Sequence, residues 1–113
     1  MDKKEALKQI KAGDFSLADA DEKLKSNKKI VLAAVKQNGY ALEDADKKLR
    51  ADKEVVLAAV KENGAALEYA NEKLKADKEV VLAAVKQDGS ALDYVDDSLK
   101  NNPDILAIVN KDK

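Results

Sequence analysis

The chain repeats itself every 25 residues, and the register is kept to the residue. Residues 52–64 return as residues 77–89 with two substitutions, and in a looser form as residues 27–39. The same step links an Asp or Asn at positions 2, 27, 52, 77 and 102. Self-similarity at such a period is typical of stacked arrays, in which each unit buries its apolar face against its neighbours.

Each unit has the pattern of two short helices. The Asp or Asn that opens the unit can accept a hydrogen bond from the free N–H groups of a first turn, so the first helix is predicted to begin there. It is predicted to end at Gly39, Gly64 and Gly89 in the middle units, where glycine can adopt the left-handed conformation that closes a helix. A second apolar stripe at helical spacing then predicts the second helix, as in Ala41, Leu42, Ala45 and Leu49.

These patterns predict an all-α fold, an α-solenoid of short stacked helix pairs with about nine helices in four and a half repeats. We expect one domain over residues 1–113. Its expected units are residues 2–26, 27–51, 52–76 and 77–101, followed by a capping helix at 102–111.

The end copies indicate the direction of stacking. The column that holds Ile30, Ala33 and Ala34 becomes Glu5, Lys8 and Gln9 in the first copy. In the last copy the columns of Leu57 and Val60 become Ala107 and Asn110. We therefore expect the Ile30 face to pack on the preceding unit and the Leu57 face on the following one. On this basis we expect a complete, capped array that is a monomer.

Composition narrows the possible functions. There are 21 basic and 22 acidic residues, so the net charge of −1 gives no bulk attraction to nucleic acid or membrane. The chain has neither Cys nor His, which excludes disulfides and removes the commonest general base and metal ligand. The longest apolar run covers only residues 55–60, far less than a membrane span needs. We expect a cytoplasmic protein that is not an enzyme and has no catalytic residues, cofactor, metal site or membrane contact.

The sequence of residues 52–70 resembles a known repeat family. Its features are the run Asp-Lys-Glu-Val-Val-Leu-Ala-Ala-Val-Lys, an Asn-Gly pair and an Ala-Leu pair. They resemble a family of tandem helical repeats, found in bacteria, protists and large viruses, that is known as a domain of unknown function. The resemblance covers residues 27–100 well, with 2–26 and 102–110 as weaker copies. It implies the repeat fold and brings no catalytic residue, ligand or partner.

The aromatic residues fall in the predicted second helices, in two columns four residues apart. Positions i and i+4 share a helix face, so each second helix would present one ring at about the same place. The rings either cover the contact between units or form, with neighbouring acids, a row that grips a partner segment. These partner-binding candidates are Phe15, Tyr40, Tyr69, Tyr94, Asp19 and Asp44.

Lysines also recur in register. One column lies in the first turn of the first helices, where the helix dipole disfavours a cation. With two adjacent lysines it gives the candidate anion contacts Lys3, Lys4, Lys28, Lys29, Lys53 and Lys78. Another column, at positions 11, 36, 61, 86 and 111, lies in the last turn of each first helix. We interpret that column as complementing the helix dipole.

The best functional hypothesis from the sequence is a non-enzymatic repeat scaffold that binds a protein or peptide along one face. One alternative is binding of a polyanion or nucleic acid through the lysine columns, which would weaken steeply with salt. Another is a small inhibitor or regulator of a specific enzyme.

Overall fold

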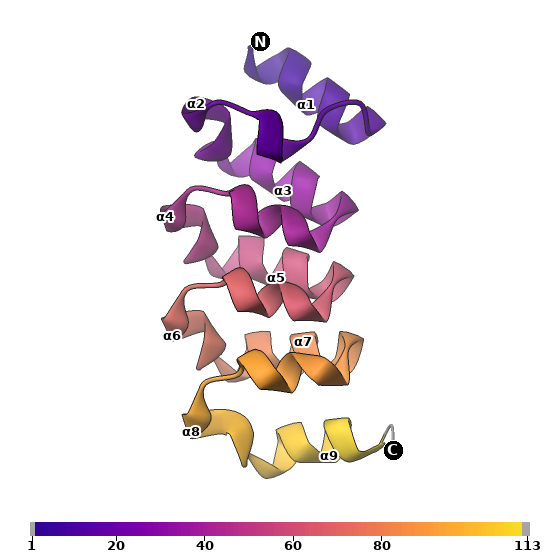
Figure 1. The fold of residues 1–113 in the computed structure, drawn as a ribbon, viewed down its shortest axis with the longest axis vertical. Helices are drawn as coiled ribbons and strands as arrows, with labels where there is room; N and C mark the ends of the chain where they lie inside the picture. The colour runs from indigo at the N-terminus through magenta and orange to yellow at the C-terminus, as the bar shows by residue number, and fades with distance from the viewer. Residues whose placement is uncertain (1, 112–113) are drawn as a thin grey trace.

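The structure, a computed structural model, describes residues 2–111. Five α-helices of nearly equal length stack side by side in chain order (Figure 1). They are α1 (Lys3–Ala12), α3 (Lys28–Gln37), α5 (Lys53–Glu62), α7 (Lys78–Gln87) and α9 (Pro103–Lys111). The described residues form helices and no strand, and the molecule is elongated, with extents of 47 × 24 × 17 Å. The predicted all-α solenoid is confirmed.

The long helices begin where the repeat predicts. The Oδ1 atom of Asp2 accepts a hydrogen bond from the N–H of Glu5 at 2.8 Å, and Asn27 accepts one from Ile30 at 3.1 Å. Asp52, Asp77 and Asn102 cap their helices in the same way. A single column of Asp and Asn therefore sets the start of every long helix.

The predicted second helix is wrong in its form. Each unit has a 3₁₀-helix followed by a one-turn α-helix in place of one continuous α-helix. The pairs are η1 (Leu17–Asp19) with α2 (Glu22–Lys25), η2 (Gly39–Asp44) with α4 (Lys47–Arg50), η3 (Gly64–Tyr69) with α6 (Glu72–Lys75), and η4 (Gly89–Tyr94) with α8 (Asp97–Lys100).

A second Asp/Asn column, at positions 21, 46, 71 and 96, causes this break. Ala45 is extended, and the side chain of Asp46 caps α4 through the N–H of Lys48 at 2.9 Å. The N–H of Asp46 itself donates to the carbonyl oxygen of Lys25 in the preceding unit at 3.0 Å. Equivalent bonds join Asn71 to Arg50 and Asp96 to Lys75. The backbone donor that a continuous helix would use internally thus links neighbouring units.

The expected left-handed glycines are also wrong for the middle units. Among the described residues only Gly13 has a positive φ, of 81°. Gly39 and Gly64 are required for close packing, because a Cβ at either position would overlap the carbonyl oxygen of Ala59 or Ala84, respectively, in the next unit. Backbone therefore meets backbone between successive units.

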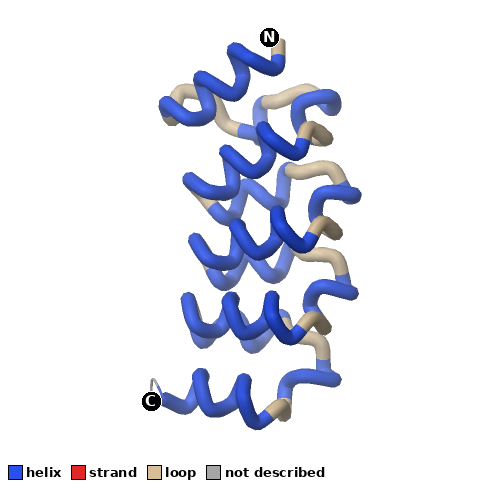
Figure 2. The backbone as a smooth tube through the Cα atoms, turned by 180° about the vertical axis from the view of Figure 1, so that it is seen from behind, coloured by secondary structure: helices blue, strands red, loops and turns tan. Residues whose placement is uncertain are grey.

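The units form two layers around a continuous apolar core. The long helices make one layer, seen in front in Figure 2, and the 3₁₀-helices make the other, with the short helices along one edge. Ile30, Val31 and Val35 of α3 are buried between them, as are their counterparts in α5 and α7. The carbonyl oxygen of Ala59 lies on the side of the preceding unit, which agrees with the expected direction of stacking.

Candidate functional site

Charge is divided between the two layers. The 3₁₀-helices contain acidic residues and no lysine or arginine, whereas lysines outnumber acidic residues by more than two to one in the five long helices. The net charge of −1 therefore conceals an acidic layer and a basic layer. The two layers suit partners of opposite charge, and each holds one set of the candidate residues.

The predicted tyrosines all lie in the acidic layer. Tyr40 is in η2, Tyr69 in η3 and Tyr94 in η4, and these 3₁₀-helices stack directly on one another. Because a 3₁₀-helix has three residues per turn, positions four apart do not share a face, and the expectation of one common ring position fails. The rings differ in exposure: Tyr40 is 44% exposed, whereas Tyr69 and Tyr94 are half-buried against the core.

The tyrosines nevertheless lie within electrostatic range of one another. The pKa of Tyr69 is raised chiefly by the negative charge of Glu43, and then by burial, Glu68 and the other two phenols. The carboxylate of Glu43 in η2 is therefore within electrostatic range of the Tyr69 phenol in η3. Binding of a partner by this row stays a prediction, and the half-burial of Tyr69 and Tyr94 supports the alternative that they cover the contact between units.

The other members of the aromatic set are at the N-terminal end. Phe15 precedes η1 in a loop, outside any helix, and is half-buried. It lines a hollow of about 410 Å³ together with Asp19, which is exposed at the end of η1. Asp44, at the end of η2, is half-buried. The structure thus brings Phe15 and Asp19 together.

The first-turn lysines connect successive units through ion pairs. The amine of Lys28 lies 3.0 Å from Asp52 and 2.9 Å from Glu54. Lys53 repeats the arrangement with Asp77 at 3.0 Å and Glu79 at 2.9 Å, and Lys78 lies 2.7 Å from Asp104. Each lysine therefore bonds to the first turn of the next long helix, where the dipole favours the carboxylates that it meets.

Two of these ion pairs, Lys28 with Asp52 and Lys53 with Asp77, shift the pKa of both partners. The hydrogen bonds that Lys28 donates to Glu54 and, with a smaller effect, to Asp52 raise the pKa of Lys28 above its ordinary value. Partial burial alone would raise the pKa of Asp52, but the Lys28 ion pair and the N–H of Val55 outweigh it, so the pKa lies below the ordinary value. Lys53 and Asp77 behave in the same way. The charged forms of both groups are the ones that stabilise the stack.

Three of the six proposed anion contacts are therefore engaged in ion pairs between units. Lys3 is the counterpart of Lys28 in the first unit. At the two positions where Lys28 meets carboxylates in the next unit, Lys3 would meet Asn27 and Lys29, so neither position offers it a carboxylate. Lys3, Lys4 and Lys29 are exposed. Anion binding stays a prediction, and the N-terminal lysines are its better-placed members.

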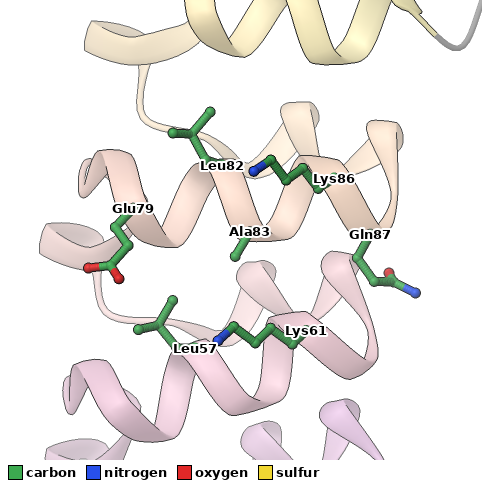
Figure 3. Close-up of a pocket in the computed structure, with 7 residues that line it drawn as sticks. All are labelled: Leu57, Lys61, Glu79, Leu82, Ala83, Lys86 and Gln87. Carbon is green, nitrogen blue, oxygen red and sulfur yellow. The ribbon is translucent and has the colours of Figure 1, made fainter.

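A surface that the sequence hypotheses missed lies on the outer face of the long helices. A hollow of about 510 Å³ between α5 and α7 is lined by Leu57, Lys61, Glu79, Leu82, Ala83, Lys86 and Gln87 (Figure 3). A second, of about 490 Å³ between α3 and α5, is lined by Lys36, Glu54, Leu57, Ala58, Lys61 and Glu62. Leu57 and Lys61 line both, so the hollows join into one surface along the stack. We name it the leucine–lysine track, after Lys36, Leu57, Lys61, Leu82 and Lys86.

The local geometry of the track follows from the helix period. Leu57 and Lys61 are four residues apart and share one face of α5, as Leu82 and Lys86 do in α7. Figure 3 shows each lysine side chain running back along its helix toward the leucine. Both leucines are half-buried, so part of each side chain remains open to solvent. The regular spacing of Leu and Lys in the sequence is the signal that could have revealed this surface. By itself, however, that pattern indicates packing between units for the leucines and complementation of the helix dipole for the lysines.

Across residues 2–111, no three potential metal ligands among Asp and Glu gather closely enough to hold an ion together. Nor does any helix in this part of the chain have the length and apolar character needed to cross a membrane.

Comparison with known proteins identifies the family alone. No curated protein matches the chain significantly, and no solved structure does so either. The family match runs in overlapping segments over residues 4–50, 52–100 and 77–111, which confirms the resemblance that the repeat motif predicted. The chain belongs to the family described as a domain of unknown function, DUF4116.

Proposed function

We propose that the protein is a non-enzymatic scaffold that binds a protein or peptide segment along the leucine–lysine track. One observation supports this most directly: two consecutive hollows share Leu57 and Lys61 and so form one extended surface. Its floor of leucine and alanine with charged residues beside it has the character of an interface core with a polar rim. Stacked repeats provide such extended surfaces as a consequence of their architecture.

The remaining surface supports action as a monomer. Among the described residues, Tyr40 is the only large hydrophobic side chain that is exposed. Obligate oligomers bury extensive apolar surface, and the part of the chain that the structure describes offers no comparable patch beyond the track. The proposed location is the cytoplasm, which the lack of cysteine supports.

Polyanion binding through the first-turn lysines has less support. Lys28, Lys53 and Lys78 would have to exchange their carboxylate partners for phosphate. The gain in binding would be reduced by the loss of contacts between units. We therefore favour the peptide-binding function over the nucleic-acid alternative.

A random-peptide display against the intact protein tests the proposal. We expect enriched peptides that bind the wild-type protein and the Tyr40→Ser variant, and that lose binding to the double variant Leu57→Gln and Leu82→Gln. Glutamine is unbranched at Cβ, as leucine is, and has a high helix propensity, so the stack should remain folded, which circular dichroism would check.

The outcome can contradict the proposal in two ways. Failure to enrich any binder would oppose a peptide-binding function. Binding that survives the leucine changes and is lost with Tyr40→Ser would transfer the site to the acidic layer and the tyrosines.

A further inference from the structure

The charges of the track define its occupant more closely, on the basis of the proposed function. We infer that the track binds an acidic segment in the extended polyproline II conformation, which lies lengthwise across the long helices from α1 to α7 with an acidic residue at every third position. The segment's most acidic end lies over α1 and α3.

The first step concerns the charges that remain available in the track. Lys36, Lys61 and Lys86 contribute one amine per unit, and none forms an ion pair within the described part of the chain. The acids Glu54 and Glu79 already bond to Lys28 and Lys53 at 2.9 Å. Glu62 is the one further acid that lines the hollows, against three lysines without an ion pair. The unpaired charge is therefore mainly positive, and a partner with carboxylates at the same spacing is complementary to it.

The second step concerns direction. The column that holds Glu54 and Glu79 in the middle units holds Lys4 in α1 and Lys29 in α3. The outer alanine column, represented by Ala58 and Ala83 in the hollows, becomes Lys8 in α1. Lys4, Lys8, Lys11 and Lys29 are all exposed. Positive charge thus increases toward the N-terminal end of the same surface, which orients an acidic segment.

The third step concerns spacing. Helices packed side by side lie about 8–10 Å apart. An extended chain advances about 3.3 Å per residue and a polyproline II chain about 3.1 Å, so three residues span one unit. A helix rises about 1.5 Å per residue and needs roughly six residues per unit, which is not a whole number of its turns. Its acidic side chains would rotate away from the lysine row, and those of a β-strand at every third position would alternate between opposite faces. A polyproline II chain has three residues per turn, so every third side chain stays on the face of the lysine row.

The floor of the track favours a peptide over a nucleic acid. It consists of Leu57, Leu82 and the adjacent Ala58 and Ala83, and the long helices contain neither an aromatic residue nor an arginine. Single-stranded nucleic acids are usually held by stacking of bases on aromatic rings or arginine, in addition to charge. Methyl groups beside an amine suit alternating apolar and acidic side chains better.

A fluorescent peptide of four Glu-Leu-Pro triplets provides the direct probe. We expect it to bind the full chain, and a peptide with the same residues but irregularly spaced glutamates to bind at least about fivefold more weakly, since only part of its charge can pair in register. A peptide of four Lys-Leu-Pro triplets should not bind measurably.

Two charge-matched variants locate the site. Lys61→Glu with Lys86→Glu alters the track, whereas Lys48→Glu with Lys73→Glu makes the same change in net charge at exposed lysines of α4 and α6. We expect the first to weaken binding of the Glu-Leu-Pro peptide by about tenfold or more and the second by less than about twofold. The track variant should instead gain affinity for the Lys-Leu-Pro peptide, which a merely unfolded protein would not do.

Several results would overturn the inference. They are equal losses in the two variants, equal binding of the regular and irregular peptides, or tighter binding of a twelve-nucleotide oligothymidine at the same lysines. Display peptides that bind the track without regularly spaced acids would refute this inference and leave the proposed function intact. Absence of any peptide binding that depends on Leu57 and Leu82 would refute both.

Discussion

The backbone of Gly64 lies against the carbonyl oxygen of Ala84 in the next unit, so close that a Cβ on Gly64 would overlap that oxygen. The N–H of Gly64 donates a hydrogen bond to the side-chain oxygen of Gln87, which also belongs to the next unit. One repeat earlier, Gly39 meets Ala59 in the same way and donates to Asn63 at 2.8 Å. This contact fixes how closely two successive units approach.

The first prediction tests this contact. Gly64→Ala should lower the free energy of unfolding by roughly 1–3 kcal/mol, because the added methyl meets backbone that cannot move without separating two units. The measurement is urea denaturation followed by circular dichroism.

Gly89→Ala is the matched control, since the nearest atom to its Cβ would be Cγ1 of Val109 at 4.0 Å and its φ is not positive. We expect it to be neutral or to stabilise by up to about 1 kcal/mol, because alanine restricts the unfolded chain. Equal destabilisation at the two positions would show that glycine is needed there for another reason.

The glycines also illustrate what the sequence could predict. The period, the capping column and the buried columns follow from local chemistry and were correct, because each depends on one unit at a time. A glycine after a helix has two explanations, a left-handed turn or a close approach by another segment. Only the position of the next unit distinguishes them, and Gly13 and Gly64 differ for that reason.

The same limit explains why the second helix was predicted in the wrong form and why the leucine–lysine track was missed. Asp46 falls inside the second helix that the apolar spacing predicts, whereas its N–H bonds to Lys25 of the preceding unit and its side chain starts a new helix. The exposure of Leu57 and Leu82 likewise depends on the distance between α5 and α7, which no local pattern gives. The sequence identifies the leucine column as apolar, but it does not show that part of each leucine side chain remains exposed to solvent.

The second prediction concerns acid stability. The pKa values of Asp52 and Asp77 lie below the ordinary value of 3.8, so their contribution to stability is complete above pH 3.8 and is lost as the pH falls through the lower folded values. The double variant Asp52→Asn with Asp77→Asn should melt a few degrees below the wild type at neutral pH. The difference should disappear in strong acid.

Asparagine is the appropriate replacement because Asn27 and Asn102 already cap long helices in this chain. The cap is therefore retained and the bonds from Lys28 to Asp52 and from Lys53 to Asp77 lose their charge, whereas the ion pairs with Glu54 and Glu79 remain. These lysines have pKa values raised above 10.5, so the pairs should remain intact until the pH rises beyond that value. A melting difference that is the same at neutral pH and in strong acid would contradict the assigned role of the ion pairs.

The third prediction concerns the direction of stacking. Ala59 is fully buried on the side of the preceding unit, so Ala59→Lys should destabilise the array by about 3 kcal/mol or more, because an amine would be buried without a partner. Gln9 is at the equivalent position of α1 and is only half-buried. Gln9→Lys should change stability by less than about 0.5 kcal/mol. Equal shifts in thermal unfolding would refute the assignment of this face.

The fourth prediction separates packing from partner binding in the acidic layer. Tyr69→Ala with Tyr94→Ala should lower the free energy of unfolding by about 2–4 kcal/mol, because both rings are half-buried against the core. Tyr40→Ala should be close to neutral, since that ring is 44% exposed. Chemical denaturation of the three proteins measures the difference.

Replacement by phenylalanine is the control that isolates the rings from their hydroxyl groups. Tyr69→Phe with Tyr94→Phe should retain stability if the rings cover the contact between units.

In addition, Glu43→Gln should lower the pKa of Tyr69 in an ultraviolet titration, because the charge of Glu43 is the main cause of its elevation. If alanine at both positions left stability unchanged but abolished binding of a displayed peptide, the tyrosine row would be the partner surface, and the track would have to be assigned another role.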